Sequence, residues 1–337
     1  MAFDRRSLLL GGMVLLGSAC ARAQPGGSGA VTSNVDWATF KAAFLDPTGR
    51  VVDNGNGGVS HSEGQGYALM LAVRNGDRAA FDRMFDWTQA HLARPDVALY
   101  AWRYDPRETE PVADPNNATD GDIFIAWALA EAARLWRTPR YRERSDAIRA
   151  AIRSRLVVER HDRLLLLPGL DGFMNGEQVT LNPSYYVWSA LDAFRALDGD
   201  AAWGRVIADG EALIGKARFG PLALPTDWID VGEQDRVTPA AGRPARFGFD
   251  AVRVPLYAWA GGRVALLPPI IAWWQGYVAG GKAIPAWVDV QSGESAPYAL
   301  SAGGMAIAAR LLGMAPPTLL SDDYYAATLQ LLAATPR

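Results

Sequence analysis

Hydrophobic residues recur at three- and four-residue spacing along most of the chain, which is the period of amphipathic helices. The pattern predicts eleven helices, and a twelfth could lie in an irregular segment. The predicted helices span 37–44, 66–73, 78–92, 120–136, 140–156, 185–197, 201–219, 250–260, 268–279, 299–312 and 322–333. Most connections between them are short and built from Gly, Pro, Asp and Asn, which favour turns.

Three longer irregular segments, 94–119, 163–184 and 221–249, hold tryptophans and acidic residues. Short strand-like runs appear at 98–103 and 164–167. Paired helices with long loops between some of them predict an all-α toroid of helical hairpins, and functional residues often lie on such loops. No repeat of solenoid length and no phosphate-binding glycine loop after a strand is present, which argues against a solenoid and a nucleotide enzyme. No break in composition divides 34–337, so we expect a single domain there.

The first 23 residues have the order of a secretory signal peptide. Arg5-Arg6 precede an apolar run, and small residues follow as far as Ala23. The A-x-A pattern that ends at Ala23 predicts cleavage before Gln24, with a linker over 24–33. We therefore expect a periplasmic or secreted protein, and the paired arginines leave twin-arginine export open.

A lipoprotein anchor at Cys20 is the competing interpretation of this segment. The residues before it, Gly17-Ser18-Ala19, match that signal poorly. Cys20 is the only cysteine, so cleavage before Gln24 leaves a mature chain without disulfide or thiol chemistry.

Composition narrows the functional classes. The formal net charge of -3 gives no reason to expect a nucleic acid or an anionic membrane as a partner. Three scattered histidines make no metal-ligand pattern, so we expect no metal and no cofactor. Twelve tryptophans and eleven tyrosines exceed what a core alone needs and suit a site that stacks sugar rings.

A first acidic cluster surrounds Glu63. Ser62 has the character of a helix N-cap with Glu63 in the first turn. Gly64 and Gly66 weaken the helix start, which a chain tolerates where a second helix or a ligand must approach the backbone closely. The alternative is a capping glutamate favoured by the helix dipole.

Two further clusters each open a predicted helix. Asp120 and Asp122 are two residues apart and point to different sides of a helix, so one should cap or pair while the other faces the site. Asp250 and Arg253 share a helix face, and a partly buried carboxylate kept ionised by arginine is what a general base needs. Helix capping and a surface ion pair are the structural alternatives.

Together these clusters resemble glycoside hydrolase family 8, and the resemblance covers nearly the whole mature chain. The motifs that carry it are Ser62-Glu63-Gly64-Gln65-Gly66-Tyr67, Ala118-Thr119-Asp120-Gly121-Asp122, Asn182-Pro183-Ser184-Tyr185, Asp227-Trp228 and Phe249-Asp250-Ala251-Val252-Arg253. The family often has tyrosine before the last aspartate, where this chain has Phe249. Within the family, the likeness is greatest to the periplasmic endoglucanase encoded with bacterial cellulose synthase.

The resemblance implies an (α/α)6 barrel and inverting hydrolysis of β-1,4-glucan. It implies Glu63 as proton donor, Asp250 as the base that activates water, and Asp120 at the sugar ring where the bond breaks. The residues expected to bind substrate are Trp102, Tyr185, Trp188 and Trp228 as sugar platforms, with Arg253, Gln65 and Asp122 as polar contacts. A monomer that associates functionally with a cellulose synthase complex is the expected context.

Other functions stay open at this point. A related chitosanase would use extra carboxylates such as Asp230 and Glu233 to bind ammonium groups, and a xylanase or mixed-linkage glucanase would share the same chemistry. A polysaccharide lyase on a similar toroid would need a tyrosine or histidine base. A non-catalytic glycan-binding protein of a secretion complex would need neither Glu63 nor Asp250.

Overall fold

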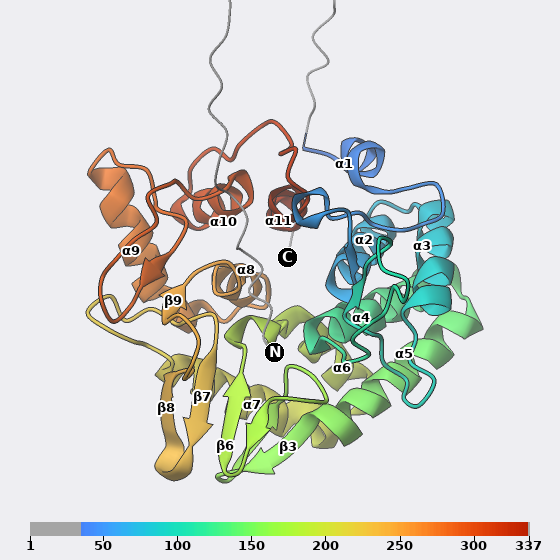
Figure 1. Cartoon of the computed structure of the whole chain (residues 1–337), viewed down its shortest axis with the longest axis horizontal. Coiled ribbons are helices and arrows are strands. Elements are labelled where there is room, and N and C mark those ends of the chain that lie inside the picture. The colour runs from blue at the N-terminus through green and yellow to red at the C-terminus, as the bar shows by residue number, and fades with distance from the viewer. Residues whose placement is uncertain (1–34, 336–337) are drawn as a thin grey trace, which may run out of the picture.

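The computed structural model describes residues 35–335, and that part of the chain contains eleven α-helices (Figure 1). They are α1 (Trp37–Phe44), α2 (Ser62–Arg74), α3 (Arg78–His91), α4 (Thr119–Trp136), α5 (Pro139–Ala151), α6 (Trp188–Asp198), α7 (Asp200–Lys216), α8 (Arg253–Ala260), α9 (Pro268–Ala279), α10 (Ala302–Leu312) and α11 (Tyr324–Ala334). Each predicted helix overlaps one of them, so the helical pattern is confirmed. The predicted signal peptide, its Cys20 and the linker lie outside the described residues.

Six helices form a closed ring around a common centre (Figure 1). Around the ring, each helix contacts the next in the order α2, α4, α6, α8, α10 and α11, and α11 contacts α2. Five outer helices pack against the ring. The pairs of outer and inner helix are α1 with α11, α3 with α2, α5 with α4, α7 with α6 and α9 with α10. The fold is therefore an (α/α)6 toroid, and within the described part of the chain no helix covers the connection 313–323 between α10 and α11.

The inner helices are buried on nearly all sides. In α2, twelve of thirteen residues are buried, whereas only six of fourteen are buried in the outer helix α3. A helix that is surrounded by others must be apolar or internally hydrogen-bonded all round. Polar residues of α2 therefore need partners inside the protein, which matters for the site below.

Two glycines bring the N-terminal ends of α2 and α4 into contact. A Cβ atom at Gly66 would lie 2.7 Å from the Cβ of Phe124, and one at Gly121 would lie 2.7 Å from the backbone nitrogen of Glu63. No side chain fits at either position, so the predicted close approach of a second helix is confirmed. The predicted N-cap role of Ser62 is wrong, because Ser62 is the first residue of α2 and its buried Oγ packs against Gly121.

In the described part of the chain, ten short strands lie in the connections between helices. They are β1 (Ser60–His61), β2 (Arg103–Tyr104), β3 (Val157–Arg160), β4 (Arg163–Leu166), β5 (Met174–Asn175), β6 (Gln178–Leu181), β7 (Ile229–Gly232), β8 (Arg236–Pro239), β9 (Arg246–Phe247) and β10 (Val288–Asp289). All pairs are antiparallel: β1–β2, β3–β4, β9–β10 and a sheet of order β5-β6-β7-β8. The predicted strand at 164–167 matches β4, whereas the run 98–103 forms only isolated bridges before β2 begins.

Candidate active site

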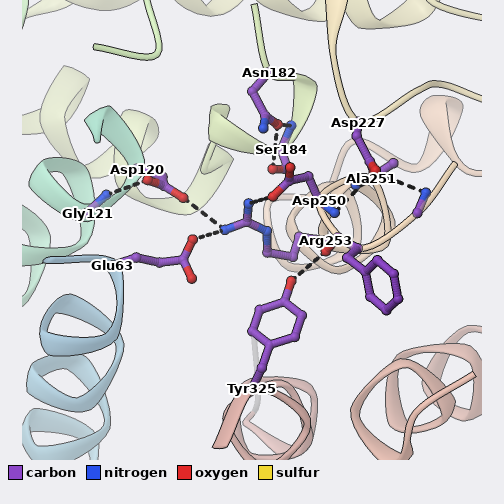
Figure 2. Close-up of polar contacts among 12 residues, drawn as sticks. Glu63, Asp120, Gly121, Asn182, Ser184, Asp227, Asp250, Ala251, Arg253 and Tyr325 are labelled. Carbon is purple, nitrogen blue, oxygen red and sulfur yellow. Dashed lines mark hydrogen bonds and ion pairs between the residues drawn. The ribbon is translucent and has the colours of Figure 1, made fainter. Parts of the chain in front are cut away.

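Three carboxylates from distant parts of the chain meet at one arginine (Figure 2). Nη1 of Arg253 donates to Glu63 Oε2 at 2.5 Å and to Asp120 Oδ2 at 2.9 Å. Nη2 of the same guanidinium group donates to Asp250 Oδ1 at 2.7 Å. Glu63 and Asp120 therefore share one nitrogen, while Asp250 is held on the other.

All four side chains lie at or just before the start of a helix. Glu63 lies in the first turn of α2 and Asp120 in the first turn of α4, where the two helices touch. Asp250 lies in the turn that precedes α8, and Arg253 is the first residue of α8. The spacing of three residues lets Arg253 reach back to Asp250 while its guanidinium group extends to the other two acids.

One buried guanidinium group cannot balance three charged carboxylates. Asp120 is fully buried, and this burial, together with the neighbouring Glu63 carboxyl, raises the pKa of Asp120 well above its usual value despite the opposing charge of Arg253. Because the two carboxyls interact strongly, the proton belongs to the Glu63–Asp120 pair. The Glu63–Asp120 pair therefore favours a bound proton more strongly than an isolated carboxyl does, and it lies opposite Asp250 on the other nitrogen of Arg253.

Tyrosines complete the surroundings of Arg253. Tyr67 Oη accepts from Arg253 Nη1 at 2.9 Å and lies 2.9 Å from Tyr257 Oη, and the guanidinium carbon lies 5.8 Å from the ring centre of Tyr185. Burial raises the pKa of Tyr67 and of Tyr185 well above the usual value. These hydroxyls stay protonated at neutral pH, which disfavours the tyrosine base of a lyase.

Two of the predicted sugar platforms, Trp102 and Trp228, are half-buried rings. Trp102 stacks on His61 with ring centres 6.0 Å apart, and its backbone carbonyl accepts from the backbone nitrogen of Ser62 at the start of α2. Trp228 lies 6.2 Å from the ring of Tyr185 and is parallel to Phe173 at 5.8 Å. Phe173 was not anticipated from the sequence.

Trp188 lies in the core instead of at an accessible surface. It is 1 % exposed, Gly261 packs against its side chain, and the Arg263 guanidinium group lies over its ring at 5.3 Å. Its ring has no open face for a sugar, so the structure does not support the predicted platform.

Gln65 and Asp122 hold loops and do not face solvent. Both are fully buried. The Gln65 amide binds the backbone of Val51 at 2.6 Å and the hydroxyl of Thr88 at 2.9 Å. The Asp122 carboxylate accepts from the backbone nitrogen of Tyr100 at 2.9 Å and from Asn117. The expectation that they contact substrate is not supported, because their hydrogen bonds are already made within the protein.

Two residues near Asp250 were missed as site residues. Asp227, quoted above only as part of a motif, accepts hydrogen bonds from the turn that carries Asp250, and Tyr325 at the start of α11 donates to the Phe249 carbonyl (Figure 2). The partners are backbone groups far away in sequence, so residue spacing carries no signal for them. Within residues 35–335, no group of three or more His, Cys, Asp or Glu side chains is arranged to hold a metal ion.

Comparisons with known proteins identify the family of the chain. The family model described as "Glycosyl hydrolases family 8" matches residues 18–336. The chain is 42% identical over 278 residues to an endoglucanase of Cellulomonas uda, covering 82% of this chain and 77% of the relative. It is 38% identical over 333 residues to a probable endoglucanase of Novacetimonas hansenii, covering 96% and 95%.

A solved structure shows the same architecture. The fold matches that of a GH8 endo-β-1,4-glucanase from an Achatina fulica gut metagenomic library with a TM-score of 0.86 and 41% identity, over 91% of this chain and 98% of the other. The chain therefore belongs to glycoside hydrolase family 8.

Proposed function

We propose that this protein is an inverting endo-β-1,4-glucanase. The observation that carries the proposal is the set of Glu63, Asp120 and Asp250 around Arg253 in a chain of family 8. Glu63 is the proton donor, Asp250 is the base that activates water, and Asp120 lies at the sugar ring whose bond breaks.

The geometry supports these roles through charge and exposure. The protonated Glu63–Asp120 pair can give a proton to the glycosidic oxygen, and the remaining charge on the pair stabilises the positive sugar ring of the transition state. The Asp250 side chain is 25% exposed, compared with 7% for Glu63, so water can reach the base more easily than the acid. Arg253 Nη2 donates to Asp250 Oδ1 and so orients the carboxyl group that accepts the proton of water.

The substrate is proposed to be a neutral β-1,4-glucan. The names of the relatives support this, and so does the half-buried ring of Trp102. The Trp228 ring is packed against Phe173 and the Arg243 guanidinium group, so it gives less support. A chitosanase is less well supported, because the buried Asp230 carboxylate accepts hydrogen bonds from Gln178, Thr180 and the Ala241 backbone. Its oxygens are thus occupied by protein donors and are not available for ammonium groups.

Parallel reducing-sugar assays on carboxymethylcellulose, chitosan and xylan test the substrate. We expect the highest rate on carboxymethylcellulose. A higher rate on chitosan or xylan would change the glycan assignment, and binding of glucan without release of reducing ends would instead indicate a non-catalytic glycan-binding protein.

The first sugar released from a β-linked glucan is expected to be the α-anomer. A retaining enzyme needs its acid and nucleophile about 5–5.5 Å apart, whereas an inverting enzyme needs about 6.5–9.5 Å so that water fits between base and sugar. Glu63 and Asp250 bind different nitrogens of Arg253, and Asp120 shares the nitrogen of Glu63. Proton NMR during the first minutes of hydrolysis identifies the anomer, and a β-anomer seen first would contradict the inverting mechanism.

Export and a role beside cellulose synthase belong to the same proposal. Among residues 35–335, no helix is long and apolar enough to cross a membrane. The arginine pair, apolar run and A-x-A site support export with a mature chain that starts at Gln24. N-terminal sequencing of the exported protein distinguishes this start from a lipid-modified Cys20, and co-purification with cellulose synthase tests the association.

A further inference from the structure

The turn that carries Asp250 is bound along its backbone by one carboxylate. Oδ1 of Asp227 accepts from the backbone nitrogens of Gly248 at 3.0 Å, Asp250 at 3.1 Å and Ala251 at 2.7 Å (Figure 2). A single side chain thus fixes three peptide groups around Asp250.

Gly248 is shaped to admit this carboxylate. A Cβ atom at position 248 would lie 2.6 Å from Asp227 Oδ2, closer than any real Cβ contact. The backbone of Gly248 has no positive φ angle that would itself require glycine. The absence of a side chain at this position is therefore explained by the approach of Asp227.

A second side chain holds the intervening peptide from the other side. The hydroxyl of Tyr325 donates to the backbone carbonyl of Phe249 at 2.6 Å. Tyr325 comes from α11, whereas Asp227 precedes β7, so two distant elements bind the turn on either side (Figure 2). The residues just before and after Asp250 cannot rotate without breaking these bonds.

The Asp250 carboxylate itself is bound on one oxygen only. Oδ1 accepts from Arg253, and no residue within 35–335 donates to Oδ2. The direction of that second oxygen depends on the backbone of the turn, since Arg253 alone leaves the carboxylate free to pivot about one contact. Burial and the nearby Asp250 raise the pKa of Asp227 to about 7.

We propose that Asp227 is a positioning residue for Asp250: it fixes the turn so that Oδ2 of Asp250 points at the attacking water. This inference rests on the proposed function, in which Asp250 is the base. Asp227 acts through the backbone, with Tyr325 as the second anchor, and does not touch the substrate. A misplacement of about 1 Å at a reacting group can cost about 10²-fold in rate.

The test compares Asp227→Ala, which removes the oxygen that accepts from the turn, with a matched control on the neighbouring strand. Asp230 is buried, follows Asp227 by three residues and accepts three hydrogen bonds, but none from the turn of Asp250. For Asp227→Ala we expect kcat on carboxymethylcellulose to fall about 10²-fold with little change in KM. For Asp230→Ala we expect kcat to stay near the wild-type value, whatever its thermal stability.

A second variant perturbs the same contact from the other side. Gly248→Ala pushes the Asp227 carboxylate away and should lower kcat in the same way. Gly276→Ala is its control, because a Cβ atom there meets nothing within 4 Å. The double variant Asp227→Ala/Gly248→Ala should lose little more than either single variant, because both changes break one interaction.

Three results would overturn the proposal: wild-type kcat in Asp227→Ala or in Gly248→Ala, a change in KM alone, or multiplicative losses in the double variant. If Asp227→Ala fails to fold by circular dichroism, Gly248→Ala decides the question alone. Asp250→Asn is measured in parallel. Activity in Asp250→Asn would refute the proposed base, whereas an inactive Asp250→Asn beside a fully active Asp227→Ala would refute only the present inference.

Discussion

Glu63→Gln is expected to abolish glucan cleavage while leaving the fold and glucan binding nearly intact. The substitution keeps the shape of the side chain but removes the proton that the Glu63–Asp120 pair holds. Loss of a general acid costs about 10²–10⁴-fold in rate or more. The buried amide can still accept from Arg253, so the helix start should keep its structure. Reducing-sugar release on carboxymethylcellulose measures the rate.

The control for this variant is Glu143→Gln on the exposed face of α5, which should leave the rate unchanged. Thermal unfolding followed by circular dichroism checks the fold, and gel electrophoresis in the presence of soluble glucan checks binding. Turnover close to the wild-type value in Glu63→Gln would remove Glu63 from the mechanism. Loss of binding together with activity would instead place Glu63 among the substrate contacts.

The toroid could be predicted because its helices keep a strong three- and four-residue period. The inner helices are apolar on several faces, and polar residues at their starts mark the rim of the ring. Glu63, Asp120 and Asp250 stand out for the same reason: each lies at or just before a helix start, next to glycine or aromatic residues. The sequence could not show that one guanidinium group joins all three, because that contact depends on how α8 faces α2 and α4.

The predictions of site residues that the structure does not support share a physical cause. Gln65 and Asp122 stand beside the acids in sequence and were expected at the substrate, but on an inner helix such side chains turn toward loop backbones. Trp188 was expected at a surface because tryptophan suits sugars, yet in this toroid its position on α6 faces the core. Asp227 was not recognised as part of the site, because its partners are N–H groups that every residue carries. Side-chain chemistry can be read from a sequence, but the direction of a side chain in a buried helix cannot.

Arg253→Met is expected to lower the free energy of unfolding by about 3–5 kcal/mol at pH 7, because it leaves buried carboxylates without their cation. Methionine fills a similar volume, so the decrease in the free energy of unfolding measures mainly the loss of the positive charge. The Arg253 side chain is 1% exposed and its partner Asp120 is 0% exposed, so water cannot replace the guanidinium group. Urea unfolding at several pH values measures the effect.

The pH dependence of this destabilisation distinguishes the loss of the arginine charge from the loss of its packing contacts. In the wild type, burial and Glu63 already raise the pKa of Asp120, and removal of Arg253 takes away the group that opposes this rise. A carboxyl whose pKa is higher in the folded than in the unfolded state stabilises the fold most below its unfolded value, here 3.8, and loses that contribution as pH rises. The difference between Arg253→Met and the wild type should therefore be small near pH 4 and largest near pH 7.

Arg149→Met is the matched control for this measurement. Arg149 is almost as buried, with a side chain that is 5% exposed, but its partners Asp198 and Asp146 are 15% and 54% exposed. Those carboxylates can rehydrate when the arginine is lost, so the destabilisation should be smaller and nearly independent of pH. If Arg253→Met instead lost the same free energy at pH 4 and pH 7, the stem of the arginine would stabilise the site by packing. The charge balance of the three acids would then have to come from protons shared among the acids themselves.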